Sequence, residues 1–224
     1  MQENQATTGE RTELVFILDR SGSMGGLEGD TIGGFNAMLA KQKELDAPCR
    51  VTTALFDDKY ELLHDRIDLM AVRPLTDQEY FVRGSTALLD AVGRTIGKIQ
   101  RAQDHTAAGY RAAKVVFVII TDGMENASRE FTYAHVKELI NERKAGGGWE
   151  FVFLGANIDA AAEAGRMGIA PDRAQNFHAD AQGTEAVYNA MSESIQSYRS
   201  GPRPLGAEWK EKINRDYEGR KKKR

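Results

Sequence analysis

The sequence predicts an α/β protein with a doubly wound, mostly parallel six-stranded sheet that has one antiparallel edge strand and helices on both faces. Short apolar runs alternate with longer segments whose apolar residues recur every three or four positions. The runs contain few polar residues, which is typical of parallel strands buried on both faces. This alternation of strands and helices indicates a Rossmann-like arrangement.

Six segments have the composition of β-strands. The run at residues 114–120 is the most apolar, so we place it near the centre of the sheet. Residues 51–56 and 60–67 are joined by a tight polar turn, which makes them antiparallel neighbours. The strands are expected at residues 14–18, 51–56, 60–67, 114–120, 149–155 and 174–178.

Five segments between and after these strands have helical periodicity. In residues 86–102 the apolar side chains fall on one helical face, and three consecutive glycines at 146–148 end the helix expected before them. The helices are expected at residues 28–45, 86–102, 133–144, 159–167 and 184–198.

The composition excludes several classes of protein. The chain has 224 residues, a net charge of −3 and 41% hydrophobic residues, which is typical of a globular domain. Cys49 is the only cysteine, so a disulfide framework and a cysteine-based zinc site are excluded. The longest apolar run is too short to span a bilayer, and the polar first ten residues contain no apolar leader segment. We therefore expect a soluble cytoplasmic protein that does not bind membranes.

The chain divides into a flexible N-terminus (1–11), one domain (12–199) and a basic C-terminal tail (200–224). Residues 201–224 hold nine Lys and Arg against four acids, a net charge of +5, which leaves −8 for the rest of the chain. We expect this tail to be mobile, with a docked helix at residues 207–217 as the alternative. An acidic body argues against nucleic-acid binding, except weakly through the tail.

Three polar clusters lie next to predicted strands and helices, and we expect them at one edge of the predicted sheet. The first strand ends in Asp19-Arg-Ser-Gly-Ser23, a loop before a helix carries Gly84-Ser-Thr86, and the central strand ends in Thr121-Asp-Gly123. Ligands of open α/β sheets bind beyond the carboxyl ends of the strands, where the strand order reverses. The clusters should therefore meet there.

The oxygen atoms in these clusters suit Mg²⁺, which prefers hard ligands and keeps some of its water. The expected direct ligands are the neutral hydroxyls of Ser21, Ser23 and Thr86, while Asp19 and Asp122 supply two negative charges, in part through water. A divalent ion held mostly by neutral oxygens remains electrophilic. It would bind a carboxylate from outside, which is a binding mechanism and needs no general base.

The order Asp-x-Ser-x-Ser, then a Thr at the start of the second major helix, then Thr-Asp-Gly after an apolar strand resembles the von Willebrand factor type A (vWA) family. The resemblance covers residues 12–199. It implies that the metal-ion-dependent adhesion site of that family is formed here by five residues, Asp19, Ser21, Ser23, Thr86 and Asp122. It also implies Mg²⁺, or Mn²⁺ or Ca²⁺, and recognition of an Asp or Glu on a partner protein.

Since no leader segment is visible, the chain resembles the intracellular bacterial branch of the family. Members of that branch act as adaptors within larger complexes, some beside AAA+ ATPases and others in stress or metal-resistance systems. The resemblance thus implies a partner that presents an acidic side chain, in an AAA+ ATPase or a stress-response complex.

Four further residues are expected at the rim of the site, namely Gly22, Ser85, Gly123 and Glu125. For Glu125, a role at the start of a helix is an equally good interpretation. Asp57 and Asp58 also end a predicted strand, and we interpret them as turn residues or neighbours of the site.

The sequence therefore favours a Mg²⁺-dependent protein-interaction module with no catalytic residues. The alternative is a metal-dependent phosphoryl-transfer or hydrolytic enzyme that uses Asp19 as its nucleophile. Against this alternative, such enzymes carry a second acid two positions later, where this chain has Ser21, and no phosphate-binding lysine follows at an evident place. No nucleophile elbow or phosphate-binding glycine loop follows the first strand either.

Overall fold

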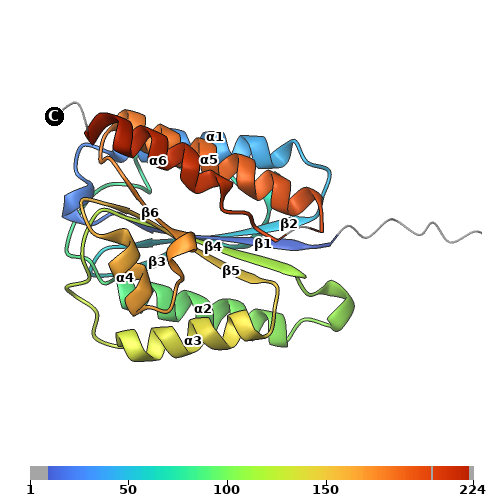
Figure 1. Ribbon diagram of the computed structural model, residues 1–224. Helices are drawn as coiled ribbons and strands as arrows, with labels where there is room; N and C mark the ends of the chain where they lie inside the picture. The colour runs from blue at the N-terminus through green and yellow to red at the C-terminus, as the bar shows by residue number, and fades with distance from the viewer. Residues whose placement is uncertain (1–9, 203, 222–224) are drawn as a thin grey trace, which may run out of the picture.

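The structure is a computed structural model that describes residues 10–202 and 204–221, and it contains the predicted mixed sheet (Figure 1). The strand order is β3-β2-β1-β4-β5-β6; β3 pairs antiparallel with β2 at one edge, and all other pairs are parallel. The strands are β1 (Thr12–Asp19), β2 (Cys49–Phe56), β3 (Tyr60–Asp68), β4 (Lys114–Thr121), β5 (Trp149–Ala156) and β6 (Ala174–Phe177). The predicted fold class is thus confirmed. The N-terminus that we expect to be flexible lies largely outside the described residues.

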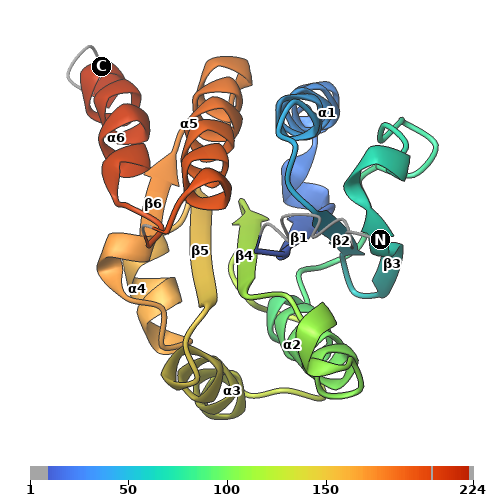
Figure 2. The same ribbon diagram turned by 90° about the vertical axis from the view of Figure 1, so that its right-hand side faces the viewer.

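Helices cover both faces of the sheet. In Figures 1 and 2, α1, α5 and α6 lie on one face, and α2, α3 and α4 lie on the other. Each face of the sheet has its own hydrophobic core, and successive residues of β1 point to opposite faces. Phe16 packs in the core on the α1 side, and Ile17 packs in the core on the α2 side. The helices are α1 (Glu28–Lys43), α2 (Leu88–Asp104), α3 (Tyr133–Ala145), α4 (Ala160–Arg166), α5 (Ala181–Ser200) and α6 (Glu208–Lys221).

The centre of the sheet is where the strand order reverses. The chain moves from β1 to β2 and β3 on one side, and then crosses to β4 on the other side of β1. Every residue of β1 and β4 is buried. Their carboxyl ends therefore form a rigid base for the loops that follow them, at the position where open α/β sheets bind ligands.

Helix α2 begins two residues later than the sequence predicts. The backbone amide of Thr86 donates to Asn126 Oδ1 at 2.9 Å, and that of Ala87 donates to the Asp57 carbonyl at 2.9 Å. Because these amides bond to neighbouring loops, the helical register starts only at Leu88. Thr86 thus lies in the loop before the helix.

The expectation of a mobile C-terminal tail is wrong for its described part, which contains the docked helix α6. The side chains of Leu205, Trp209 and Ile213 are at most 1% exposed, in the core between the sheet and α5. The ring of His178, after β6, stacks on Tyr217 with centroids 4.7 Å apart. In the sequence, charged residues surround these few apolar positions, so their helical periodicity is weak. Trp209 and Ile213 are four residues apart, which places both on one face of α6.

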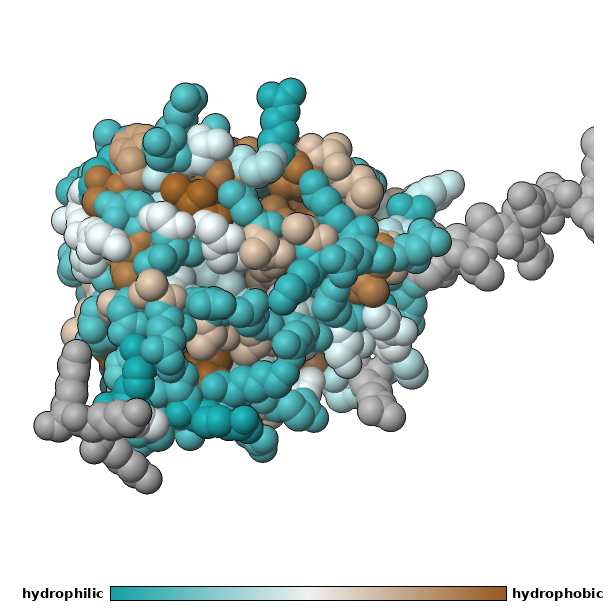
Figure 3. All heavy atoms as spheres, turned by 90° about the horizontal axis from the view of Figure 1, so that it is seen from above, coloured by the Kyte–Doolittle hydropathy of each residue, from teal (hydrophilic) through white to brown (hydrophobic). Residues whose placement is uncertain are grey.

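The surface over α1, α5 and α6 is mainly hydrophilic. Viewed from that side, charged and polar side chains dominate and the apolar patches between them are small (Figure 3). None of the helices in the described part of the chain has both the length and the apolar character needed to cross a bilayer.

Replacing Trp209 by alanine should lower the free energy of unfolding by about 3–5 kcal/mol, because a fully buried indole between α6 and the sheet is lost. Urea denaturation followed by circular dichroism measures this change. The matched control is Tyr110→Ala, since that ring is 61% exposed and its loss should cost about 1 kcal/mol or less. Equal effects of the two substitutions would show that α6 is not docked in solution.

Candidate metal centre

Three loops meet at the carboxyl ends of β1 and β4. Asp19 is the last residue of β1, and a 3₁₀ turn at Gly22–Met24 follows it. Asp122 directly follows β4, and Thr86 comes from the loop before α2. The strand order places these three loops side by side, although their residues lie far apart in the chain.

The predicted hydroxyl residues form one continuous chain of contacts with Asp122. Thr86 Oγ1 lies 3.1 Å from Ser21 Oγ, which in turn lies 3.1 Å from Ser23 Oγ. Ser23 Oγ donates to Asp122 Oδ1 at 2.5 Å. Ser21, Thr86 and Asp122 are buried, whereas Ser23 is exposed. The cluster therefore opens to solvent on the Ser23 side.

Asp19 lies beneath this cluster and is fully buried. Its Oδ1 accepts the backbone amide of Ser21 at 2.7 Å, and its Oδ2 accepts Thr121 Oγ1 at 2.5 Å. Burial raises the pKa of Asp19 to about 6, although these hydrogen bonds lower it and the nearby charge of Asp122 raises it further. Sequence reasoning did not predict that Thr121 would bond to Asp19. The position of Thr121 beside Asp122, at the end of an apolar strand, is the feature of the sequence that could have indicated it.

Asp122 provides the test of whether the cluster suits a cation. Burial raises the pKa of its carboxyl group, and Asp122 Oδ2 is buried without a hydrogen-bond partner in the described residues. A buried carboxylate oxygen without a partner is costly, and a divalent cation would satisfy it. The donor set, two carboxylates and three hydroxyls, is of the hard oxygen type that Mg²⁺ prefers.

Clusters of charged or sulfur ligands that could bind a metal ion elsewhere are absent from the described residues. Within the described residues, no group of three or more His, Cys, Asp or Glu side chains has a geometry that could hold an ion. A metal centre in this part of the chain therefore depends on the serine and threonine hydroxyls.

Two of the expected rim glycines lie where the loops meet, and one of them, Gly123, allows a close approach. A Cβ atom on Gly123 would lie 2.8 Å from Thr86 Oγ1 and 3.1 Å from Ser23 Oγ. The backbone amide of Gly22 donates to the carbonyl of Gly84 at 3.1 Å, which joins the loop after β1 to the loop before α2. Ser85, also expected at the rim, is exposed.

The carboxylate of Glu125 is directed to backbone amides. Glu125 Oε2 accepts the amide of Leu89 at 2.9 Å, in the first turn of α2, and the hydroxyl of Ser128 at 2.7 Å. Glu125 Oε1 accepts the amides of Ala127 and Ser128. Glu125 thus satisfies one free amide in the first turn of α2, where a negative charge is favourable, and two amides of its own loop.

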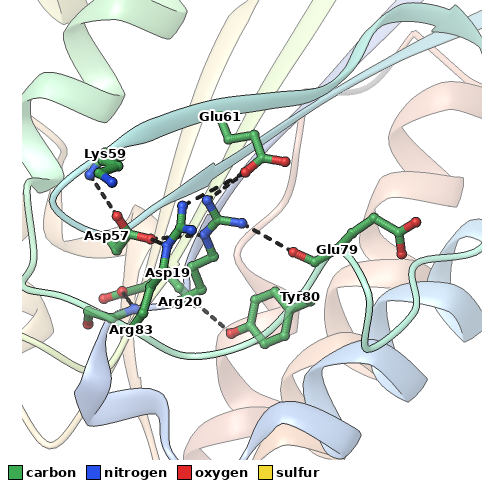
Figure 4. Close-up of polar contacts among 9 residues, drawn as sticks. Asp19, Arg20, Asp57, Lys59, Glu61, Glu79, Tyr80 and Arg83 are labelled. Carbon is green, nitrogen blue, oxygen red and sulfur yellow. Dashed lines mark hydrogen bonds and ion pairs between the residues drawn. The ribbon is translucent and has the colours of Figure 1, made fainter.

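A second cluster of charges lies beside the hydroxyl residues, and sequence reasoning did not find it. Arg20 is fully buried, and its guanidinium contacts Asp57 Oδ2 at 3.1 Å and Glu61 Oε2 at 2.7 Å (Figure 4). Asp57 Oδ2 also accepts Arg83 Nε at 2.6 Å. Burial raises the pKa of Asp57, but the hydrogen bond and charge of Arg83 outweigh it and leave that pKa below its usual value. The only signal in the sequence was an arginine and an aspartate at strand ends.

Comparisons with known proteins identify similar folds among solved structures. No protein-family model and no curated protein matches the chain. Among solved structures, the vWF domain of the type V pili tip protein Mfa5 from Porphyromonas gingivalis superposes with a TM-score of 0.56 at 11% identity, over 88% of this chain and 98% of that one. A von Willebrand factor type A protein from Catenulispora acidiphila superposes with a TM-score of 0.54 at 14% identity, over 83% of this chain and 42% of that one.

A third similar structure is proximal thread matrix protein 1 from the mussel byssus, solved with zinc in its MIDAS motif. It superposes with a TM-score of 0.55 at 13% identity, over 83% of this chain and 46% of that one. This chain thus spans less than half of that protein. The chain has a vWA-like fold, as its motifs led us to expect; at these identities, the likeness concerns the fold alone.

Replacing Glu125 by alanine should lower the free energy of unfolding by about 1–2 kcal/mol, because the Leu89 amide in the first turn of α2 and the Ala127 and Ser128 amides lose their acceptor. Glu125→Gln keeps one carbonyl oxygen and should cost less. Urea denaturation of both variants in the absence of divalent cations measures the difference. A stability equal to that of the wild type in both variants would contradict this capping role.

Proposed function

We propose that this chain is a Mg²⁺-dependent protein-interaction module whose ligand is an acidic side chain of a partner protein. The observation that carries the proposal is the chain of three contacting hydroxyls that ends on Asp122, whose buried Oδ2 has no partner in the described residues. The vWA-like fold supports it, and so does the order of these residues in the sequence, which resembles the MIDAS motif of that family.

Ser21, Ser23, Thr86, Asp19 and Asp122 would hold the ion. Asp19 and Asp122 supply its counter-charge, and Thr121 and the Ser21 amide fix the orientation of the Asp19 carboxylate. A bound Mg²⁺, or Mn²⁺ or Ca²⁺ in its place, would act as a Lewis acid that accepts a carboxylate oxygen. Ser23, on the exposed side, marks where that carboxylate would enter.

The partner would be a protein that presents Asp or Glu. We infer an adaptor role in a cytoplasmic bacterial complex, such as one built around an AAA+ ATPase or a stress-response system. Support for this role comes from the resemblance of the motifs to the intracellular branch of the family. The acidic partner itself is inferred from the hard, electrophilic character of the proposed centre.

The alternative, phosphoryl transfer or hydrolysis with Asp19 as the nucleophile, gains no support from the geometry. Asp19 is fully buried, and both of its carboxylate oxygens accept hydrogen bonds, so neither is directed to an incoming phosphate. Steady turnover of para-nitrophenyl phosphate that is lost in Asp19→Asn would reverse this ranking.

Asp19→Asn should weaken Mg²⁺ binding at least tenfold, because one of the two counter-charges is lost while the size of the side chain is kept. Isothermal titration calorimetry with MgCl₂ measures the affinity, and circular dichroism checks that the fold is retained. The matched control is Asp46→Asn, which removes an exposed carboxylate just before β2, at the opposite edge of the sheet, and should leave the affinity unchanged. Unchanged Mg²⁺ affinity in Asp19→Asn would show that the site is assigned wrongly.

A carboxylate from solution should displace water from the centre. With Mn²⁺ as the probe ion, the water-proton relaxivity of the complex should fall when acetate is added and should not fall with acetamide, its neutral analogue. Thr86→Ala, which removes one hydroxyl ligand, should reduce the Mn²⁺-dependent signal itself. Identical responses to acetate and acetamide would contradict recognition of a carboxylate.

A further inference from the structure

Arg20 lies between Asp19 and Ser21, at the first unspecified position of the Asp-x-Ser-x-Ser motif, and its side chain is part of a hydrogen-bond network beside the site. It is fully buried, and its guanidinium makes three contacts with separate parts of the chain. Nε donates to Asp57 at the end of β2, Nη2 donates to Glu61 on β3, and Nη1 donates to the carbonyl of Glu79 at 3.1 Å. Figure 4 shows these groups arranged around the guanidinium.

Asp57 joins this arginine to the loop before α2. Asp57 Oδ2 accepts both Arg20 Nε and Arg83 Nε, and the backbone carbonyl of Asp57 accepts the amide of Ala87 at 2.9 Å. The loop passes so close that a Cβ atom on Gly84, which has φ of +66°, would lie 2.1 Å from Asp58 Oδ1. The path of the loop thus depends on the two aspartates at the end of β2.

The same loop is attached to the backbone next to Asp19. The amide of Arg83 donates to the carbonyl of Arg20 at 2.9 Å, and the hydroxyl of Tyr80 donates to the carbonyl of Asp19 at 2.5 Å. Since residues 81–87 belong to no helix or strand, these contacts set where the loop runs. The hydroxyl of Thr86 reaches Ser21 at the end of this path.

We propose that Arg20 is a positioning residue of the metal centre, which holds the loop at residues 79–86 against the loop after β1 and so places the Thr86 hydroxyl beside Ser21. This inference rests on the proposed function, because the positioned group is a proposed metal ligand. Arg20 itself donates to Asp57, Glu61 and the Glu79 carbonyl and to none of the proposed metal ligands.

The geometry explains why an arginine stands here. The planar guanidinium offers donors in three directions at once. A lysine ammonium is one compact group, and in the same place it would leave at least one of these acceptors without a hydrogen bond. Its burial is tolerated because Asp57 and Glu61 balance the charges of Arg20 and Arg83. Removing the Arg20 side chain takes away its hydrogen bond to the Glu79 carbonyl, while Asp57 keeps Arg83 as its ion-pair partner and so keeps a counter-charge.

The test compares Mg²⁺ affinity in Arg20→Met, Arg20→Lys and the control Arg94→Met, which breaks a surface ion pair with Glu130. We expect binding to weaken at least tenfold in Arg20→Met, to an intermediate extent in Arg20→Lys, and not at all in Arg94→Met. In the metal-free protein, hydrogen exchange of the Gly22 amide, which donates to Gly84, should accelerate in Arg20→Met and not in the control.

A double-mutant cycle with Thr86→Ala separates positioning from a general loss of stability. If Arg20 acts through Thr86, the effect of Arg20→Met on Mg²⁺ affinity should shrink to about threefold or less when Thr86 is already alanine. A full tenfold effect in that background, or wild-type affinity in Arg20→Met, overturns the inference. If Arg20→Met does not fold, Arg20→Lys takes its place in the cycle. Absence of Mg²⁺ binding by the wild type refutes the proposed function and this inference with it.

Discussion

Two buried carboxylates on adjacent parallel strands are the constraint around which this end of the molecule is arranged. Asp19 ends β1 and Asp122 follows β4, and burial raises the pKa of both. Neither makes an ion pair with Lys, Arg or His in the described part of the chain. Only neutral donors, such as Thr121, Ser23 and a backbone amide, stabilise their charge. Neutral donors reduce the cost of burying two like charges without removing it, and that imbalance favours a cation.

The neighbouring charges are balanced in the opposite way. Arg20 and Arg83 meet Asp57 and Glu61, so two cations face two anions and no charge is left over. Arg20 follows Asp19 directly in the chain, but its guanidinium is directed to β2 and β3. The cations of this region are thus held in ion pairs of their own, which leaves the two aspartates of the hydroxyl cluster without a competing arginine.

How far the sequence predicts the structure depends on how local the determining interaction is. The strands and the order of the polar clusters follow from apolar periodicity and from the rule that parallel strands end at one edge, so the convergence of Ser21, Thr86 and Asp122 could be anticipated. The Arg20 cluster could not, because residues 20, 57, 61 and 83 come together only through β2–β3 pairing and an irregular loop. The docked helix at the C-terminus ranks second to a mobile tail in the sequence analysis because Trp209 and Ile213 stand alone among charged residues, and only tertiary packing buries them.

The charge balance also determines at what range the proposed recognition would act. Asp19 and Asp122 together carry the charge that neutralises one divalent cation, so an incoming carboxylate would meet a centre without net charge. The whole chain carries a net charge of −3, which weakly repels an acidic partner at distances within about a Debye length, roughly 8–10 Å at physiological salt. Long-range steering therefore cannot favour such a partner. Its selection would depend on short-range contacts, and on how firmly the loops around Ser23 and Thr86 are held when the carboxylate arrives.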